Sequence, residues 1–163
     1  MLKETLTALY RAGDDLLSRS AGLVPTGVRV AQVPATRFRR PLLGRVEVRN
    51  GSVTQVHVGT DVALGRHLAQ HALADPREAF LQALEVFKTG LVARLPTRRP
   101  IGRVVWLEDD AREQRLRGLR SFVIAIQCEA GRLHVMADVC ARGEYEIACE
   151  SDFEQLIAER YLP

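Results

Sequence analysis

The chain has 163 residues and a mass of 18.2 kDa, which fits one compact domain that folds without a metal or a disulfide. Hydrophobic residues make up 47% and charged residues 26%, and this composition excludes a disordered, collagen-like or coiled-coil chain. The first ten residues carry an acid and have no continuous apolar core, so we do not expect them to be a secretory signal. The sequence has no apolar run near the ~20 residues of a membrane span and no C-x-x-C pair among the cysteines. We therefore expect a reduced, cytoplasmic protein that does not enter the membrane.

Arginine carries almost all of the positive charge, with 21 Arg against 2 Lys and a net charge of +3. The charge is unevenly distributed along the chain. Residues 35–49 hold five arginines and one acid, whereas residues 138–163 hold seven acids and two arginines. A polarised surface of this kind suits charged partners without identifying them.

The first part of the chain is predicted to form a long helix and then three strands. Leucines at helical spacing over residues 2–21, followed by Gly22 and Pro25, predict an amphipathic helix. A short strand over 28–33 and a basic loop follow. Residues 42–49 and 53–58 alternate around Asn50-Gly51 and therefore predict a β-hairpin.

The second part repeats this plan after a connecting helix, which Thr60 or Asp61 caps and which ends near Ala74 with Leu73 facing inward. Asp75-Pro76-Arg77-Glu78 then begins a helix over 76–95. Strands are expected over 101–107, 121–128 and 132–139, with a charged connection between the first two. The expected core includes Leu6, Leu9, Leu16, Leu84, Phe87, Leu91, Val123, Ile124 and Val135.

The fold class is α+β, with two pseudo-equivalent helix-plus-three-strand halves and a twisted antiparallel sheet packed by the long helices. This domain is expected over residues 1–139, and residues 140–163 form an appendage of the same compact unit. Ser151 and Glu154 form a capping box that predicts an extra C-terminal helix over 152–161. Its apolar stripe either caps a sheet edge or docks on another chain.

The helix over 76–95 has a polar face that carries the candidate chemistry. At about 100° per residue, Glu78, Gln82, Glu85 and Thr89 fall within about 60° of one another, opposite the apolar stripe. The helix therefore presents an amide and carboxylates side by side toward solvent. The simplest interpretation is that these residues are only the wet side of an amphipathic helix.

The order of elements and this helix resemble the CheX, CheC and FliY-type chemotaxis phosphatases. In that family the helix carries the signature E-x-x-N-x-x-x-G-N. Here Gln82 falls at the acid, Glu85 at the amide and Thr89-Gly90 at the glycine pair. The resemblance implies an acid that grips a lysine of a phosphorylated receiver domain and an amide that orients the attacking water.

Acid and amide stand in reversed order in this chain, so neither required residue occupies its own place. We therefore expect Glu78, Gln82, Glu85 and Thr89 to bind the receiver domain of a response regulator without phosphatase activity. Aspartyl-phosphate hydrolysis by Gln82 and Glu85 with exchanged roles remains an alternative. The resemblance also implies a homodimer without a cofactor of its own, because Mg²⁺ would belong to the receiver.

Two other functions remain as alternatives. One is a noncatalytic scaffold of the same fold that is similar to the switch proteins of the flagellar motor. The other is nucleic-acid binding through Arg37 to Arg40, Arg98-Arg99 and residues 112–120, although aromatic residues are only 6% and no reader motif is present.

No metal site is expected from the histidines and cysteines. His67 and His71 have chelating spacing but lack the glutamate of a zinc metalloprotease beside the first histidine. Cys128 and Cys140 are expected to be buried thiols.

Overall fold

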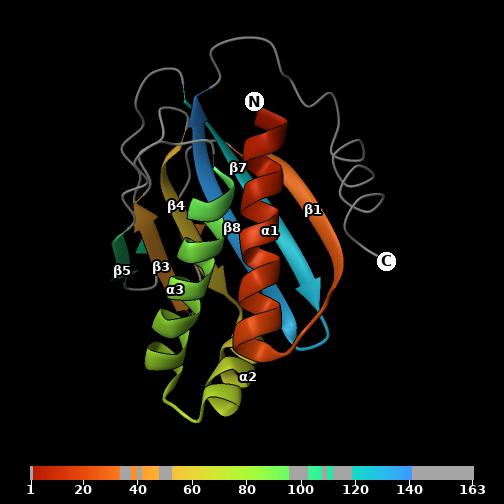
Figure 1. The fold of residues 1–163 in the computed structure, drawn as a ribbon, viewed down its shortest axis with the longest axis vertical. Coiled ribbons are helices and arrows are strands. Elements are labelled where there is room, and N and C mark those ends of the chain that lie inside the picture. The colour runs from red at the N-terminus through yellow and green to blue at the C-terminus, as the bar shows by residue number, and fades with distance from the viewer. Residues whose placement is uncertain are drawn as a thin grey trace.

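The computed structural model describes residues 2–33, 38–39, 42–47, 53–95, 103–107, 110–111 and 119–140. Figure 1 shows long helices lying across a six-stranded antiparallel sheet. The helices are α1 (Leu2–Ala21), α2 (Val62–Ala72) and α3 (Pro76–Arg94). The strands of the sheet are β1 (Pro25–Val33), β3 (Leu42–Glu47), β4 (Val53–Thr60), β5 (Arg103–Leu107), β7 (Leu119–Cys128) and β8 (Gly131–Cys140). A separate pair joins β2 (Phe38–Arg39) to β6 (Asp110–Ala111).

The strand order of the sheet, β1-β7-β8-β4-β3-β5, confirms the two-half prediction. The first half consists of α1, β1, β3 and β4, and the second of α3, β5, β7 and β8. The order is symmetric. Replacing each strand by its counterpart in the other half gives the same order read from the opposite edge of the sheet, because the first strand of each half pairs with the hairpin of the other half. Neither half therefore completes its own sheet.

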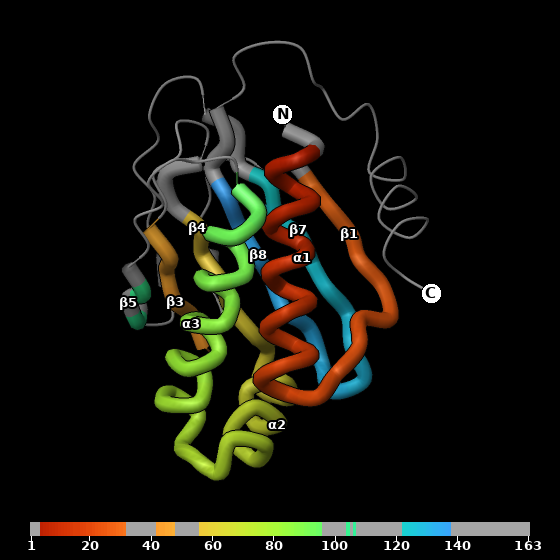
Figure 2. The backbone as a smooth tube through the Cα atoms, in the orientation of Figure 1, coloured from red at the N-terminus to blue at the C-terminus, as the bar shows by residue number. Residues whose placement is uncertain are grey.

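The core lies between the sheet and the helices α1 and α3, which run side by side in Figure 2. The predicted core is confirmed with one exception. Val123 lies on the opposite face of the sheet, where it packs against Leu43 and Met136. Successive side chains of a strand point to opposite faces, so the burial of Ile124 beneath the helices turns Val123 away.

The helix boundaries are close to those predicted, but Leu73 does not face inward. It caps α2 in the left-handed region, with φ 52° and ψ 42°, and its side chain is 93% exposed. Helix α2 ends at Ala72, one residue before Leu73, because the chain turns there to begin α3. The β2–β6 pair lies in segments predicted as the basic loop and the charged connection. The Asn50-Gly51 turn and the predicted helix over 152–161 lie outside the described residues.

Glycine lets α1 lie close to the sheet at one position. A Cβ atom added at Gly13 would come within 2.5 Å of the Ile126 Cδ1 atom on β7. The first helix is therefore seated on the strands of the second half. None of the helices described here is long and apolar enough to cross a membrane.

Candidate functional site

The predicted beginning of α3 is confirmed in detail. Asp75 is the N-cap, and its carboxylate accepts a hydrogen bond from the Glu78 amide at 3.0 Å. Pro76 occupies the first turn, where its missing N–H costs no intrahelical hydrogen bond. The Glu78 carboxylate follows in the same turn, where the helix dipole favours negative charge.

The structure brings the four predicted residues together on the solvent side of α3. Glu78, Gln82, Glu85 and Thr89 are all exposed, and we call them the α3 polar face. The Thr89 hydroxyl donates to the Glu85 carbonyl at 3.0 Å and is therefore engaged by the helix backbone. The opposite side of the helix buries Ala79, Phe80, Ala83, Leu84, Phe87, Gly90 and Leu91.

A lysine that was not among the predicted site residues lies beside this face. The Lys88 ammonium is 2.8 Å from the Glu85 carboxylate, and the Glu85 side chain is 57% exposed. Exposed ion pairs at this spacing contribute only about 0.2–0.5 kcal/mol. An external cation can therefore replace Lys88 at little cost. Glu85 and Lys88 are three residues apart in the sequence, and this spacing on a helix could have predicted the contact.

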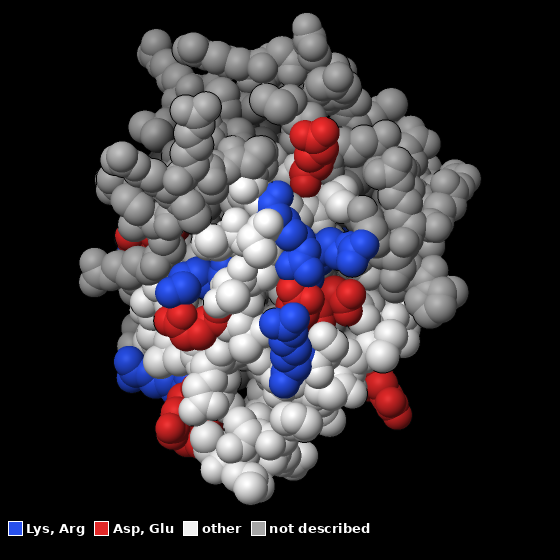
Figure 3. All heavy atoms as spheres, viewed as in Figure 1, with Lys and Arg blue, Asp and Glu red and all other residues white. Residues whose placement is uncertain are grey.

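A second charged cluster joins α3 to α1. The Arg94 guanidinium pairs with the Asp15 carboxylate at 2.6 Å and donates to the Gly90 carbonyl at 2.7 Å. A Cβ atom on Gly90 would come within 2.5 Å of the Asp15 carboxylate, so glycine keeps this space open. Gly90 thus has a packing role between the two helices. Figure 3 shows acidic and basic side chains next to one another over these two helices.

Asp14 and Tyr10 occupy the buried side of this cluster. Burial raises the pKa of the Asp14 carboxyl, and the neighbouring Asp15 raises it further, against the opposing effects of Arg11 and Arg94. Burial, with the Asp14 charge, raises the pKa of Tyr10 to about 12. The buried Tyr10 hydroxyl has no hydrogen-bond partner within the described residues.

Asp14→Asn should raise the melting temperature of the protein at neutral pH. The folded-state pKa of Asp14 lies above the unfolded value of about 3.9, so the folded state holds this proton more tightly. The bound proton therefore stabilises the folded state. This stabilisation is fully present below the unfolded-state pKa of Asp14 and is lost as pH rises through its folded-state pKa. Thermal unfolding of the variant and the wild type should therefore show a gain near pH 7 that shrinks toward pH 3.

Asp15→Asn is the matched control for this experiment, because Asp15 pairs with Arg94. It should lower the melting temperature at neutral pH. A melting temperature for Asp14→Asn at or below that of the wild type would contradict the assigned destabilisation.

The two histidines at chelating spacing, His67 and His71, make other contacts. The His67 Nε2 atom donates to the Ala21 carbonyl at 2.9 Å and so ties α2 to the end of α1. The rings of His67 and His71 stack with centroids 6.5 Å apart. Within the described residues no group of three or more His, Cys, Asp or Glu could hold a metal ion.

The cysteine prediction is confirmed for Cys128, which is free and buried. Its sulfur lies 3.3 Å from the Gly131 carbonyl, and burial raises the pKa of the thiol. The side chain of Cys140 lies outside the described residues. The same holds for the arginine clusters at Arg37 to Arg40, Arg98-Arg99 and 112–120.

The sequence matches no protein-family profile and no curated protein, but the fold has clear structural neighbours. A CheX chemotaxis protein from Desulfovibrio desulfuricans aligns with a TM-score of 0.68 and 13% identity over 83% of this chain and 99% of that chain. CheX from Vibrio vulnificus aligns with a TM-score of 0.62 and 12% identity over 83% of this chain and 99% of that chain. A chain of the CheX–CheY–BeF₃–Mg²⁺ complex from Borrelia burgdorferi aligns with a TM-score of 0.51 and 8% identity over 82% of this chain and 96% of that chain. The chain therefore has the fold of the CheX and CheC-like chemotaxis proteins.

Proposed function

We propose that this chain is a cytoplasmic accessory protein of chemotaxis-type signalling that binds the receiver domain of a response regulator through the α3 polar face. The observation that carries the proposal is the solvent-facing cluster of Glu78, Gln82 and Glu85 on α3 of a CheX-type fold. A CheX of this fold has been solved in complex with CheY, BeF₃ and Mg²⁺, which supports the same class of partner here.

The chemistry of the α3 polar face suits a phosphorylated receiver. Such a receiver presents a lysine beside its metal-bound phosphate. Glu85 already holds a lysine ammonium at 2.8 Å, and its half-exposed carboxylate can exchange Lys88 for the lysine of a partner. Replacing a pair of this kind costs at most about 1 kcal/mol. The Gln82 amide lies on the same strip and can donate to an oxygen of the partner.

The exchanged positions of amide and acid favour docking without hydrolysis. Three residues of helix advance about 4.5 Å along the axis, so exchanging the two groups moves each by that distance. A positioned water must lie ~3 Å from the phosphorus, and a misplacement of about 1 Å costs about a hundredfold in rate. The chain therefore keeps groups that can bind a receiver and lacks the arrangement that activates water.

The proposal predicts binding to phosphorylated receivers with no acceleration of phosphate loss. Calorimetric titration with receiver domains carrying BeF₃ and Mg²⁺ should give a complex that Gln82→Ala and Glu85→Ala each weaken about tenfold, or ~1.4 kcal/mol. Glu129→Ala, which removes an exposed acid at the turn between β7 and β8, is the control and should bind normally. Phosphate release from the phosphorylated receivers is followed in parallel.

Two outcomes would replace the proposal. Acceleration that disappears in both alanine variants would establish a phosphatase with exchanged roles. No binding to any receiver would leave a scaffold that uses the same fold for other protein contacts.

The homodimer implied by the resemblance remains a further prediction. β1 and β5 lie at the two edges of the sheet, and an edge strand can pair with a second copy of the chain. Light scattering should then report twice the mass of the 18.2 kDa chain, and a species of single mass at high concentration would exclude the dimer.

A further inference from the structure

A pocket of about 400 Å³ opens on the sheet face opposite α1 and α3. On β7, Ile124 and Ile126 point toward the helices, so Ala125 and Gln127 between them point away. The pocket therefore lies apart from the α3 polar face and is not part of the proposed docking function. It is lined by Gly27, Val28, Arg29, Ala125, Gln127 and Arg132.

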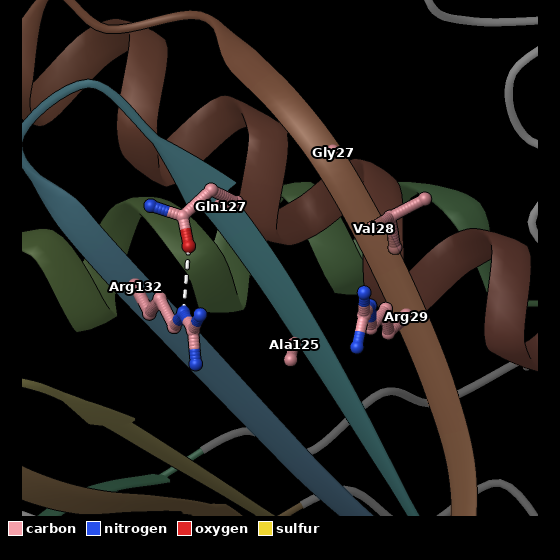
Figure 4. A pocket seen from close by; sticks show the side chains of 6 residues that line it. All are labelled: Gly27, Val28, Arg29, Ala125, Gln127 and Arg132. Carbon is pink, nitrogen blue, oxygen red and sulfur yellow. Dashed lines mark hydrogen bonds between the residues drawn. The ribbon is translucent and has the colours of Figure 1, made fainter.

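Strand register creates both the hollow and its charge. Arg29 on β1 pairs with Ala125 on β7, and Arg132 on β8 pairs with Gln127, two residues further along β7. The two arginines thus stand on the strands that flank β7, about 10 Å apart across the strands and offset by about 7 Å along them. Figure 4 shows their guanidinium groups on opposite sides of Ala125. Because Ala125 is short, the space between the two cations stays open.

Arg132 is held in place by hydrogen bonds. Its Nε donates to the Gln127 side-chain oxygen at 2.6 Å, as Figure 4 shows. The Gln127 amide in turn donates to the carbonyl oxygens of Cys128 at 3.0 Å and Gly131 at 3.3 Å. This network fixes the guanidinium through one nitrogen and leaves its terminal N–H groups for a ligand.

Among the described residues, no carboxylate forms an ion pair with either arginine of the pocket. Among its described lining residues the pocket has two arginines and no acid. The Asp61 carboxylate accepts from the Leu64 amide at 2.9 Å and from the Arg132 backbone amide at 3.0 Å, and within the described residues it forms no ion pair with either guanidinium. Arg29 is exposed and forms no ion pair within the described chain. The described lining of the pocket is therefore electropositive.

We propose that this pocket binds the phosphate group of a small phosphorylated molecule between Arg29 and Arg132. Guanidinium groups recognise phosphate oxygens through paired, charge-assisted hydrogen bonds, and two of them match a dianion. The volume exceeds that of a phosphate ion and reaches the range of small-molecule sites. The rest of such a ligand would lie along the small residues Gly27 and Ala125.

The test is calorimetric titration of the full chain at low ionic strength with inorganic phosphate, adenosine monophosphate and succinate as probes. We expect phosphate and the nucleotide to bind with dissociation constants between about 10 µM and 1 mM, and succinate to bind at least about tenfold more weakly. Tighter binding of the nucleotide would point to a phosphorylated metabolite, and equal binding to phosphate itself; both support the site.

Variants separate a built site from general electrostatics. Arg29→Gln and Arg132→Gln should each weaken binding at least about tenfold, whereas Arg19→Gln on α1 removes the same charge from the other side of the sheet and should have no effect. Ala125→Leu keeps both arginines and fills the hollow, so it should weaken binding equally. Melting temperatures check that each variant is folded.

The proposal fails if neither phosphate nor the nucleotide binds at about 5 mM, or if Arg19→Gln weakens binding as much as the pocket variants. Succinate binding as tightly as phosphate would also overturn it. An oligonucleotide that binds about a hundredfold more tightly than the mononucleotide would assign this face to nucleic acid instead.

Discussion

A chain that begins at Thr26, and therefore lacks α1, will show no cooperative unfolding transition. The first helix carries five large side chains with no solvent exposure. Each contributes about 1.5–3 kcal/mol through burial. Their combined loss approaches the whole net stability of a domain, about 5–15 kcal/mol. These side chains are Leu6, Leu9, Tyr10, Leu16 and Leu17.

The loss cannot be recovered by the remaining elements, because α1 covers strands of the other half. Ile126 and Leu133, which lie beneath Gly13 of α1, would face solvent in the shortened chain. The exposed apolar surface favours collapsed or associated states over one native structure. Urea titration followed by far-ultraviolet circular dichroism should show a broad drift in place of a sigmoidal transition.

Two point variants calibrate this experiment. Leu9→Ala should keep a sigmoidal transition and lose about 2–5 kcal/mol, because it empties one fully buried position of α1. Arg19→Gln on the exposed side of α1 should change stability by no more than about 0.5 kcal/mol. Cooperative unfolding of the chain from Thr26 would show that the two halves do not depend on each other.

Local signals were enough to predict most of the elements. The leucine spacing of α1 and the Asp75-Pro76 start of α3 act within a few residues, and both are confirmed. The exposed setting of Glu78, Gln82, Glu85 and Thr89 also followed from helical periodicity. What these residues bind is a separate question, since exposure alone does not distinguish a docking face from a solvated one.

The features that sequence reasoning missed depend on distant residues. The Arg94–Asp15 pair joins positions 79 residues apart, and no periodicity brings them together. Val123 was placed on the wrong face because a continuous apolar run on β7 does not reveal which alternate residues meet the helices. The pocket between Arg29 and Arg132 required the register of three strands.

On the proposed function, giving α3 the acid-then-amide order of the CheX and CheC-type signature should produce phosphatase activity. The double variant Gln82→Glu with Glu85→Asn places an acid one turn before an amide on the same exposed strip. The acid can then meet the receiver lysine, and the amide can hold a water in line with the phosphorus. We expect phosphate loss from a bound receiver to accelerate about 10- to 100-fold. Phosphate release from phosphorylated receivers, measured over time, provides the readout.

The single variants are the matched controls, because each supplies only one of the two groups in its required place. Gln82→Glu leaves two acids and no amide at these positions, and Glu85→Asn leaves two amides and no acid. Neither should accelerate phosphate loss, although both remain on the exposed side of α3 and leave the buried Leu84 and Phe87 untouched. If the double variant bound the receiver and still failed to accelerate the reaction, the order of acid and amide would not explain the missing catalysis. The cause would then lie in the contact surface around the α3 polar face.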